Sequence, residues 1–162
     1  MRIGHGYDSH VFAGDGTLVL GGVAFPGHPA LKAHSDGDAV AHAVIDAILG
    51  AAALGDVGAL FPDSDPRWRG ADSMELLRLA AAEVRAAGFA VGNIDVTVVC
   101  ERPKIREAVP EMRARIAAAL GADVAAVSVK GKTNEGMDAV GEGRGVVVHA
   151  VALLEPRPRA AT

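Results

Sequence analysis

The order in which strand-like and helix-like segments follow one another limits the possible folds more than any other feature of this sequence. Apolar and β-branched alternation predicts strands at residues 2–12, 17–25, 93–102, 124–130 and 146–154. Helical periodicity and capping residues predict helices at about 35–54 and 72–88, and a third that begins at about Ile105 or Pro110 and ends at Leu120. This order has too few strand–helix alternations for a doubly wound sheet. It predicts an α+β fold, a ferredoxin-like two-layer sandwich in which helices pack on one face of a small mixed β-sheet. The other, apolar face would need covering, which favours an oligomer.

Length and charge exclude several classes of protein. With 162 residues, the chain is predicted to form one domain over 1–154, followed by a disordered tail at 155–162. Its single cysteine, Cys100, excludes an intrachain disulfide and is typical of a reducing cytoplasm. A net charge of −4 gives no basis for nucleic-acid binding. No signal peptide and no apolar run of about 18 residues is visible, so we expect a cytoplasmic protein outside the membrane.

The segment GHGYDSH near the N-terminus supplies part of a possible metal site. Side chains alternate along a strand, so Asp8 and His10 project to the same side. On the first predicted helix, Asp38, His42 and Asp46 are spaced four apart and form a polar stripe. A lone histidine on an apolar helix is usually structural. One aspartate and two histidines, however, match the three protein ligands of a catalytic zinc site with its fourth position open.

His34 and Ser35 stand where the first helix is expected to begin, near Ser35 or Asp36, both good N-cap residues. The first N–H groups of a helix attract anions, and a histidine beside them can donate a further hydrogen bond. These two residues therefore indicate either a phosphate-binding position or an ordinary helix cap.

The loop GDVGALFPDSD contains Asp56, Asp63 and Asp65 together with Phe61 and glycines. Each aspartate alone is typical of a turn. Three of them in one loop that also contains an aromatic residue favour a binding loop.

A second polar cluster lies in KGKTNEG, which includes Lys130, Lys132, Thr133 and Glu135. The segment lacks the first glycine of a Walker A motif, and GEGRG further on does not match a dinucleotide-binding motif. Its mixture of cations, a hydroxyl and a carboxylate is suited to a metal-bridged diphosphate, with Glu135 helping to hold Mg²⁺.

Six motifs in register, GHGYDSH, AHSDGDAVAHA, GDVGALFPDSD, GADS, NIDVTVV and VKGKTNEG, resemble the 2-C-methyl-D-erythritol 2,4-cyclodiphosphate synthases. The resemblance extends from Met1 to about Leu154. It implies an enzyme of the non-mevalonate isoprenoid pathway, acting on 4-diphosphocytidyl-2-C-methyl-D-erythritol 2-phosphate. The 2-phosphate attacks the β-phosphorus of the diphosphate, CMP leaves and a cyclic diphosphate closes. It also implies a homotrimer with active sites between subunits, each using Zn²⁺ and a second divalent ion, Mg²⁺ or Mn²⁺.

Carried over position by position, the resemblance implies a role for each motif. The implied zinc ligands are Asp8, His10 and His42. The implied catalytic residues, which stabilise the transition state, are His34 and Thr133, and the implied ligand of the second ion is Glu135. The resemblance also implies a cytidine pocket at residues 100–106 that is supplied by the neighbouring subunit. Asp8, His10 and Glu135 are implied to contact substrate as well as metal. The other implied substrate contacts are Ser35, Asp56, Gly58, Phe61, Asp63, Asp65, Cys100, Pro103, Lys104, Arg106 and Lys132.

The chain departs from the family pattern near its last glycine-rich loop. Ala139 occupies a position that is often aromatic in the family, and Glu142 and Arg144 are exchanged relative to the usual order. In the family this arginine lies near the trimer axis, where a cavity can hold an isoprenoid diphosphate. We therefore expect weakened binding of isoprenoid diphosphates here.

Two other functions remain open from the residues alone. A zinc-dependent phosphohydrolase would use the same three ligands to activate water, and it would release inorganic phosphate without a cyclic product. A non-catalytic trimeric module would use them as a structural metal site. Structural zinc normally has four protein ligands, and the sequence shows no evident fourth one.

Overall fold

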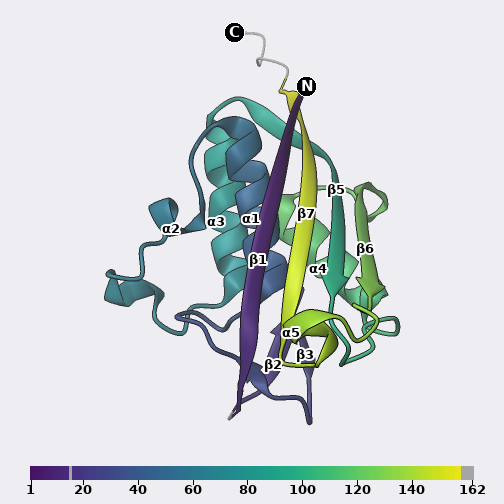
Figure 1. Ribbon diagram of the computed structural model, residues 1–162. Helices are drawn as coiled ribbons and strands as arrows, with labels where there is room; N and C mark the ends of the chain where they lie inside the picture. Colours follow the sequence, from purple (N-terminus) through teal and green to yellow (C-terminus); the bar gives the residue numbers. More distant parts are fainter. Residues whose placement is uncertain (15, 158–162) are drawn as a thin grey trace, which may run out of the picture.

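The computed structural model describes residues 1–14 and 16–157 as a sheet covered by helices (Figure 1). The strands are β1 (Arg2–Gly14), β2 (Leu18–Leu20), β3 (Val23–Phe25), β4 (Ala30–Leu31), β5 (Phe89–Val99), β6 (Val127–Lys132) and β7 (Gly145–Pro156). The helices are α1 (Ala39–Ala52), α2 (Val57–Leu60), α3 (Ser73–Ala86), α4 (Val109–Leu120) and α5 (Asp138–Gly141), with short 3₁₀ helices η1 (Pro66–Trp68) and η2 (Val124–Ala126).

The described strands form a five-stranded sheet in the order β4-β1-β7-β5-β6 and a separate β2–β3 hairpin. Strands β5 and β6 are parallel, and the other neighbours in the large sheet are antiparallel. Helices α1, α3 and α4 lie on one face (Figure 1). The predicted α+β architecture with a mixed sheet is therefore confirmed. Its main elements follow the order β-α-α-β-α-β-β, however, which differs from the βαββαβ order of a ferredoxin-like fold.

Helix α1 begins later than predicted, because its N-cap is Asp38 and not Ser35 or Asp36. The Asp38 carboxylate is buried and accepts the N–H groups of Val40 and Ala41 at 3.0 and 3.1 Å. Burial raises the pKa of this carboxyl, while the backbone N–H groups that it accepts act in the opposite direction.

The segment 17–25, predicted as one strand, is the β2–β3 hairpin. Its turn is formed by Gly21 and Gly22, whose φ angles of 60° and 75° are readily adopted by glycine. Both N–H groups donate to Asp38, at 2.8 and 2.6 Å. One buried carboxylate thus caps α1 and holds the hairpin against it.

Strand β1 and helix α1 touch backbone to backbone. A Cβ added at Gly4 would lie 2.0 Å from the carbonyl oxygen of Ala47, and one added at Gly6 would lie 1.9 Å from that of Ala43. Only glycine on the strand and small residues on the helix permit this approach. It holds the start of β1 against α1 and brings Asp8, two residues past Gly6, close to His42.

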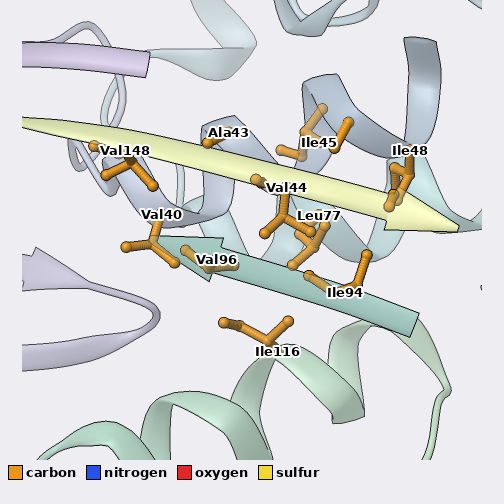
Figure 2. Packing of buried hydrophobic residues seen from close by; sticks show 14 of the residues in the cluster. Val40, Ala43, Val44, Ile45, Ile48, Leu77, Ile94, Val96, Ile116 and Val148 are labelled. Carbon is orange, nitrogen blue, oxygen red and sulfur yellow. The ribbon is translucent and has the colours of Figure 1, made fainter. Parts of the chain in front are cut away.

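The core lies between the helices and the sheet, where Val44 of α1, Leu77 of α3 and Ile116 of α4 meet Val96 and Val148 of the sheet (Figure 2). The opposite face of the sheet is largely exposed and mixes apolar side chains with polar ones, such as the His5–His149 pair and the Lys130–Asp95 ion pair. Along β1, Ile3, Tyr7 and Val11 are 75%, 50% and 57% exposed, while the glycines between Ile3 and Tyr7 are buried against α1.

Several element boundaries differ from the prediction. Strand β5 begins at Phe89, ahead of Asn93, and residues 124–126 form η2 before β6 starts. The predicted loops at 55–70 and 131–145 contain the short helices α2, η1 and α5. Strand β7 continues to Pro156, two residues past the predicted end of the domain, and residues 158–162 of the predicted tail lie outside the described residues. Within the described chain, no helix is long and apolar enough to cross a membrane.

Candidate active site

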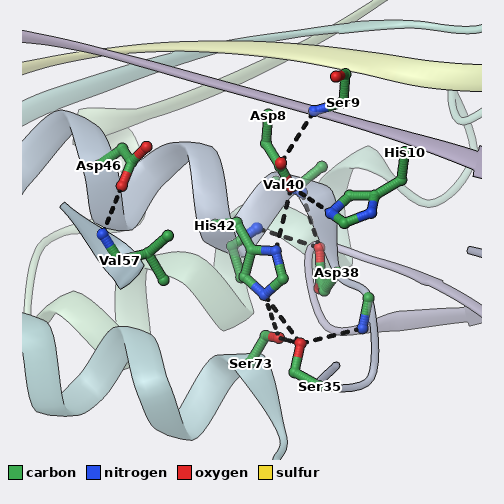
Figure 3. Close-up of polar contacts among 12 residues, drawn as sticks. Asp8, Ser9, His10, Ser35, Asp38, Val40, His42, Asp46, Val57 and Ser73 are labelled. Atoms are coloured by element: carbon green, nitrogen blue, oxygen red, sulfur yellow. Dashed lines mark hydrogen bonds and ion pairs between the residues drawn. The ribbon is translucent and has the colours of Figure 1, made fainter. Parts of the chain in front are cut away.

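Asp8, His10 and His42 come together as predicted (Figure 3). Their ligand atoms all lie within 4.8 Å of one another. His10 Nε2 and His42 Nδ1 approach the same oxygen, Asp8 Oδ2, at 3.0 and 3.1 Å. Strand alternation places Asp8 beside His10, and the close packing of β1 on α1 brings His42 to them.

The outward nitrogen of each imidazole is held by the protein. His10 Nδ1 donates to the carbonyl oxygen of Lys32 at 2.7 Å, which leaves Nε2 facing Asp8. His42 Nε2 lies 3.0 Å from the hydroxyl of Ser73 and 3.1 Å from that of Ser35 (Figure 3). Histidines that bind metals usually have their second nitrogen fixed in this way. The donor set and its supports therefore fit a divalent metal ion.

Charge in this group favours an ionised Asp8. Burial raises the pKa of its carboxyl, but the hydrogen bonds and positive charge of His10 and His42 outweigh burial and hold the pKa at about 2. Conversely, the hydrogen bond to Asp8 raises the pKa of His10 against the effect of burial. The carboxylate is thus available as a metal ligand at any physiological pH.

The other members of the polar stripe on α1 have different roles. Asp38 caps the helix, as described above. The Asp46 carboxylate accepts the N–H of Val57 at 2.8 Å and anchors the start of α2 (Figure 3). Burial raises the pKa of Asp46, the bond from Val57 lowers it, and the nearby negative charges of Asp56 and Asp8 raise it further.

A cavity of about 810 Å³ opens beside the three ligands. Of the predicted site residues it is lined by Asp8, His10, His34, Ser35, His42, Gly58, Phe61 and Asp63. The two remaining loop aspartates make turns next to it. Asp56 Oδ1 accepts the N–H of Ala59 at 2.8 Å, and Asp65 pairs with Arg67 at 2.5 Å, which lowers the pKa of that carboxyl.

A second cavity, of about 790 Å³, contains the other predicted cluster. It is lined by Cys100, Pro103, Lys104, Arg106, Lys132 and Thr133, among others. Burial raises the pKa of the Cys100 thiol to about 11, so it stays protonated. The Thr133 hydroxyl donates to the Glu135 carboxylate. The two cavities have no lining residue in common: the metal ligands line the first and Thr133 lines the second.

Sequence reasoning missed two residues behind His42 and one in the first cavity. Ser73 is fully buried, and its hydroxyl donates to Asp36 at 2.5 Å, which extends the chain of hydrogen bonds from His42. A serine directly after the N-cap Asp72 gives no signal of this role.

Trp68 also lines the first cavity, where its ring meets Phe61 edge-on with centroids 5.1 Å apart. As the single tryptophan of the chain, it could have been noted.

Comparison with known proteins agrees with this geometry. The family model described as the YgbB family matches residues 1–155. The 2-C-methyl-D-erythritol 2,4-cyclodiphosphate synthases of Escherichia coli O6:K15:H31 (strain 536 / UPEC) and Cronobacter sakazakii are each 52% identical over 154 residues, which is 95% of this chain and 97% of theirs.

Solved structures share the fold at lower sequence identity. The CDP complex of IspF from Plasmodium falciparum has a TM-score of 0.84 at 36% identity and covers 97% of both chains. The bifunctional IspDF from Campylobacter jejuni has a TM-score of 0.92 at 41% identity, and the match spans 96% of this chain but 42% of that longer one. Sequence and fold agree over nearly the whole length, and the chain therefore belongs to the YgbB family, the family of the 2-C-methyl-D-erythritol 2,4-cyclodiphosphate synthases.

Proposed function

We propose that this site closes the cyclic diphosphate of the non-mevalonate isoprenoid pathway. The chain is a cyclising lyase that converts 4-diphosphocytidyl-2-C-methyl-D-erythritol 2-phosphate to 2-C-methyl-D-erythritol 2,4-cyclodiphosphate. A 2-phosphate oxygen bonds to the β-phosphorus, the bond from that phosphorus to the CMP oxygen breaks, and CMP leaves. The observation that supports this best is the group of Asp8, His10 and His42 at the edge of a cavity large enough for the polyol phosphate.

Asp8, His10 and His42 would hold Zn²⁺. When bound, the ion would orient and polarise the attacked phosphate without generating a hydroxide nucleophile. The protein's own contribution is to fix the ligands in place. The Lys32 carbonyl and the Ser73 hydroxyl each hold an outward ring nitrogen, so the two imidazoles face Asp8 before any metal binds.

Charge neutralisation and positioning are what phosphoryl transfer requires from the remaining residues. His34 lines the cavity and would hold a phosphate oxygen in the transition state, with Ser35 contacting phosphate beside it. Thr133 would contribute the second catalytic contact. Glu135, which already accepts the Thr133 hydroxyl, would hold Mg²⁺ or Mn²⁺ near the diphosphate.

The two cavities would bind the two ends of the substrate. The methylerythritol phosphate would lie in the first cavity, whose proposed contacts are Asp56, Gly58, Phe61, Asp63 and Asp65. The cytidine end would lie in the second, whose proposed contacts are Cys100, Pro103, Lys104, Arg106 and Lys132. Two related structures are described as CDP-bound, which supports a cytidine nucleotide as a ligand of this chain. Because Cys100 stays protonated, it would contribute packing and not a nucleophile.

A homotrimer would bring the two half-sites together. The exposed apolar side chains of Ile3, Tyr7 and Val11 on the open face of the sheet support assembly. The division of the proposed contacts between two cavities supports a site shared between neighbouring subunits. A complementation experiment tests this. His42→Ala and Thr133→Ala trimers should each be inactive, while refolding an equal mixture should restore about a quarter of the sites. No recovery in verified mixed trimers would place each site within one chain.

The pocket beside the last loop is where isoprenoid diphosphates would bind if the family's accessory site persists. It has a volume of about 620 Å³ and is lined by Tyr7, Val11, Ala139 and Arg144. Arg144 Nε lies 2.9 Å from the Glu142 carboxylate, which neutralises the cation that an anionic ligand would need. We therefore propose weak binding, and micromolar affinity for geranyl diphosphate by calorimetry would contradict it.

Phosphorus NMR tests the reaction itself. Purified protein with 4-diphosphocytidyl-2-C-methyl-D-erythritol 2-phosphate and Mg²⁺ should yield the cyclic diphosphate and CMP together, and chelation of zinc should abolish both. Inorganic phosphate in place of the cyclic product would indicate the hydrolase alternative. A metal-loaded protein that turns over nothing would indicate the non-catalytic module.

A further inference from the structure

Two buried side-chain nitrogens within residues 1–14 and 16–157 have no hydrogen-bond partner: His34 Nε2 and Trp68 Nε1. Both residues line the cavity beside the metal ligands. Buried polar groups in native proteins are nearly always paired, and an exception needs an explanation. Because both exceptions belong to residues that line one cavity, a ligand bound there is the candidate partner for each nitrogen.

The ring of Trp68 is held in place on several sides. It packs edge-on against Phe61, with an interplanar angle of 76°, and the Arg67 guanidinium lies over it at 5.1 Å from the centroid. Arg67 is itself paired with Asp65. These contacts leave the indole little freedom to find another partner in the protein.

The segment after Trp68 is hydrogen-bonded to the segment that contains His34. The N–H of Gly70 donates to the His34 carbonyl at 2.9 Å, and the N–H of Asp36 donates to the Ala71 carbonyl at 3.1 Å. The two unpaired nitrogens therefore belong to neighbouring backbone segments beside one cavity. Ser35 and Lys32, which also line it, add a hydroxyl and a cation. The combination is suited to an anion.

We propose that Trp68 is a substrate-binding residue whose indole N–H donates to a phosphate oxygen of the methylerythritol phosphate. An indole nitrogen is a donor only, so it requires an acceptor. Phosphate oxygens are the strongest acceptors that the substrate offers, because hydrogen bonds to ionised groups exceed those to neutral ones. The identity of the ligand rests on the proposed function, whereas the need for an acceptor rests on the cavity alone.

The single tryptophan makes a direct test possible. A ¹⁵N-labelled zinc-loaded trimer gives one indole N–H resonance, which needs no assignment. Titration with 2-C-methyl-D-erythritol 2,4-cyclodiphosphate should shift the indole proton downfield, while CMP should leave it in place. Saturation is judged from backbone amide resonances that move. An unmoved indole resonance at saturation overturns the hydrogen bond.

Kinetics of two variants separate the N–H group from the ring. Trp68→Phe keeps an aromatic ring against Phe61 and removes the donor, and kcat/KM should fall about tenfold, mainly through KM. Trp68→Leu removes the ring as well. If packing were the only role, Trp68→Phe would match wild type and only Trp68→Leu would lose activity. A wild-type protein that makes no cyclic product would refute the proposed function, which is a different outcome from unchanged kinetics in Trp68→Phe.

Discussion

Replacing Gly6 by alanine should disturb both the fold and the metal site, because β1 and α1 touch there. The added Cβ would lie 1.9 Å from the carbonyl oxygen of Ala43 and 2.7 Å from the amide nitrogen of Ala47. Real Cβ atoms do not approach such atoms closer than 3.0 Å, so strand and helix must separate by at least 1.1 Å. Both contacts are with helix backbone, and no side-chain rotation can relieve them.

The expected loss of stability and of zinc affinity in Gly6→Ala can be estimated from the separation of β1 and α1. Overpacking that neighbouring side chains can absorb costs ~1–3 kcal/mol, and a clash with rigid backbone should cost about 3 kcal/mol or more. The same separation moves His42, adjacent to Ala43, away from Asp8, which lies two residues from Gly6. We expect zinc affinity to fall about 10–100-fold, as when the supports of a metal ligand are removed.

Urea unfolding at fixed protein concentration measures the first effect, and competition with a chromogenic zinc chelator measures the second. Gly50→Ala is the matched control, because a Cβ there meets nothing within 4 Å. It should leave zinc affinity unchanged and stabilise α1 by ~0.5–1 kcal/mol. If Gly6→Ala retains wild-type stability and zinc affinity, the contact between β1 and α1 does not set the geometry of the site.

Three further predictions concern single side chains. Asp38→Ala should lower the free energy of unfolding by about 3 kcal/mol or more, because it removes a helix cap and leaves four N–H groups unpaired, three of them buried. Asp38→Asn keeps the oxygen that accepts three of these groups and should lose less stability in the same urea titration. Ser73→Ala should weaken zinc binding about tenfold with little loss of helix content by circular dichroism, since it frees the outer nitrogen of His42; unchanged zinc affinity would mean that the serine only fills space. In zinc-free protein, ionised Asp8, with its pKa lowered from 3.8 to about 2, stabilises the fold above pH 3.8 and loses this effect as pH falls toward 2. His10, whose pKa is raised from 6.5, stabilises the fold below pH 6.5 and loses this effect as pH rises through its folded value. Stability from this pair should therefore be greatest between pH 3.8 and 6.5, and a profile that Asp8→Asn leaves unchanged would contradict the assignment.

The sequence predicts the relative position of the two metal ligands on β1, Asp8 and His10, better than that of His42 on α1. Asp8 and His10 are two apart on a strand, so alternation alone places them together. His42 could not be placed from the residues alone, because its position depends on how closely α1 approaches β1. That distance is set by Gly4 and Gly6 against three alanines of α1, a contact between segments about 40 residues apart. The chemistry of the side chains made His42 a candidate third ligand, and the resemblance to a family supported that choice.

The sequence offers three possible N-cap residues for α1, and contacts with distant parts of the chain determine which of them is the cap. Ser35, Asp36 and Asp38 are all good N-cap residues. Asp38 is the cap because its carboxylate also accepts the hairpin N–H groups of Gly21 and Gly22, whereas Asp36 bonds to Ser73. The glycine pair itself is a two-residue hairpin signal, and recognising it would have divided the predicted strand correctly.

The metal ligands stand on long regular elements, whereas much of the rest of the cavity wall stands on a loop-like segment. Asp8, His10 and His42 stand on a long strand and a long helix that touch backbone to backbone, so their geometry is set before any ligand arrives. Much of the opposite side of the cavity, including Phe61 and Trp68, stands on the segment between α1 and α3, whose α2 and η1 are single turns. Loops tolerate change more readily than the elements that they connect. Substitutions on that segment should therefore alter substrate affinity while leaving metal affinity intact, and substitutions along β1 and α1 should alter metal affinity first.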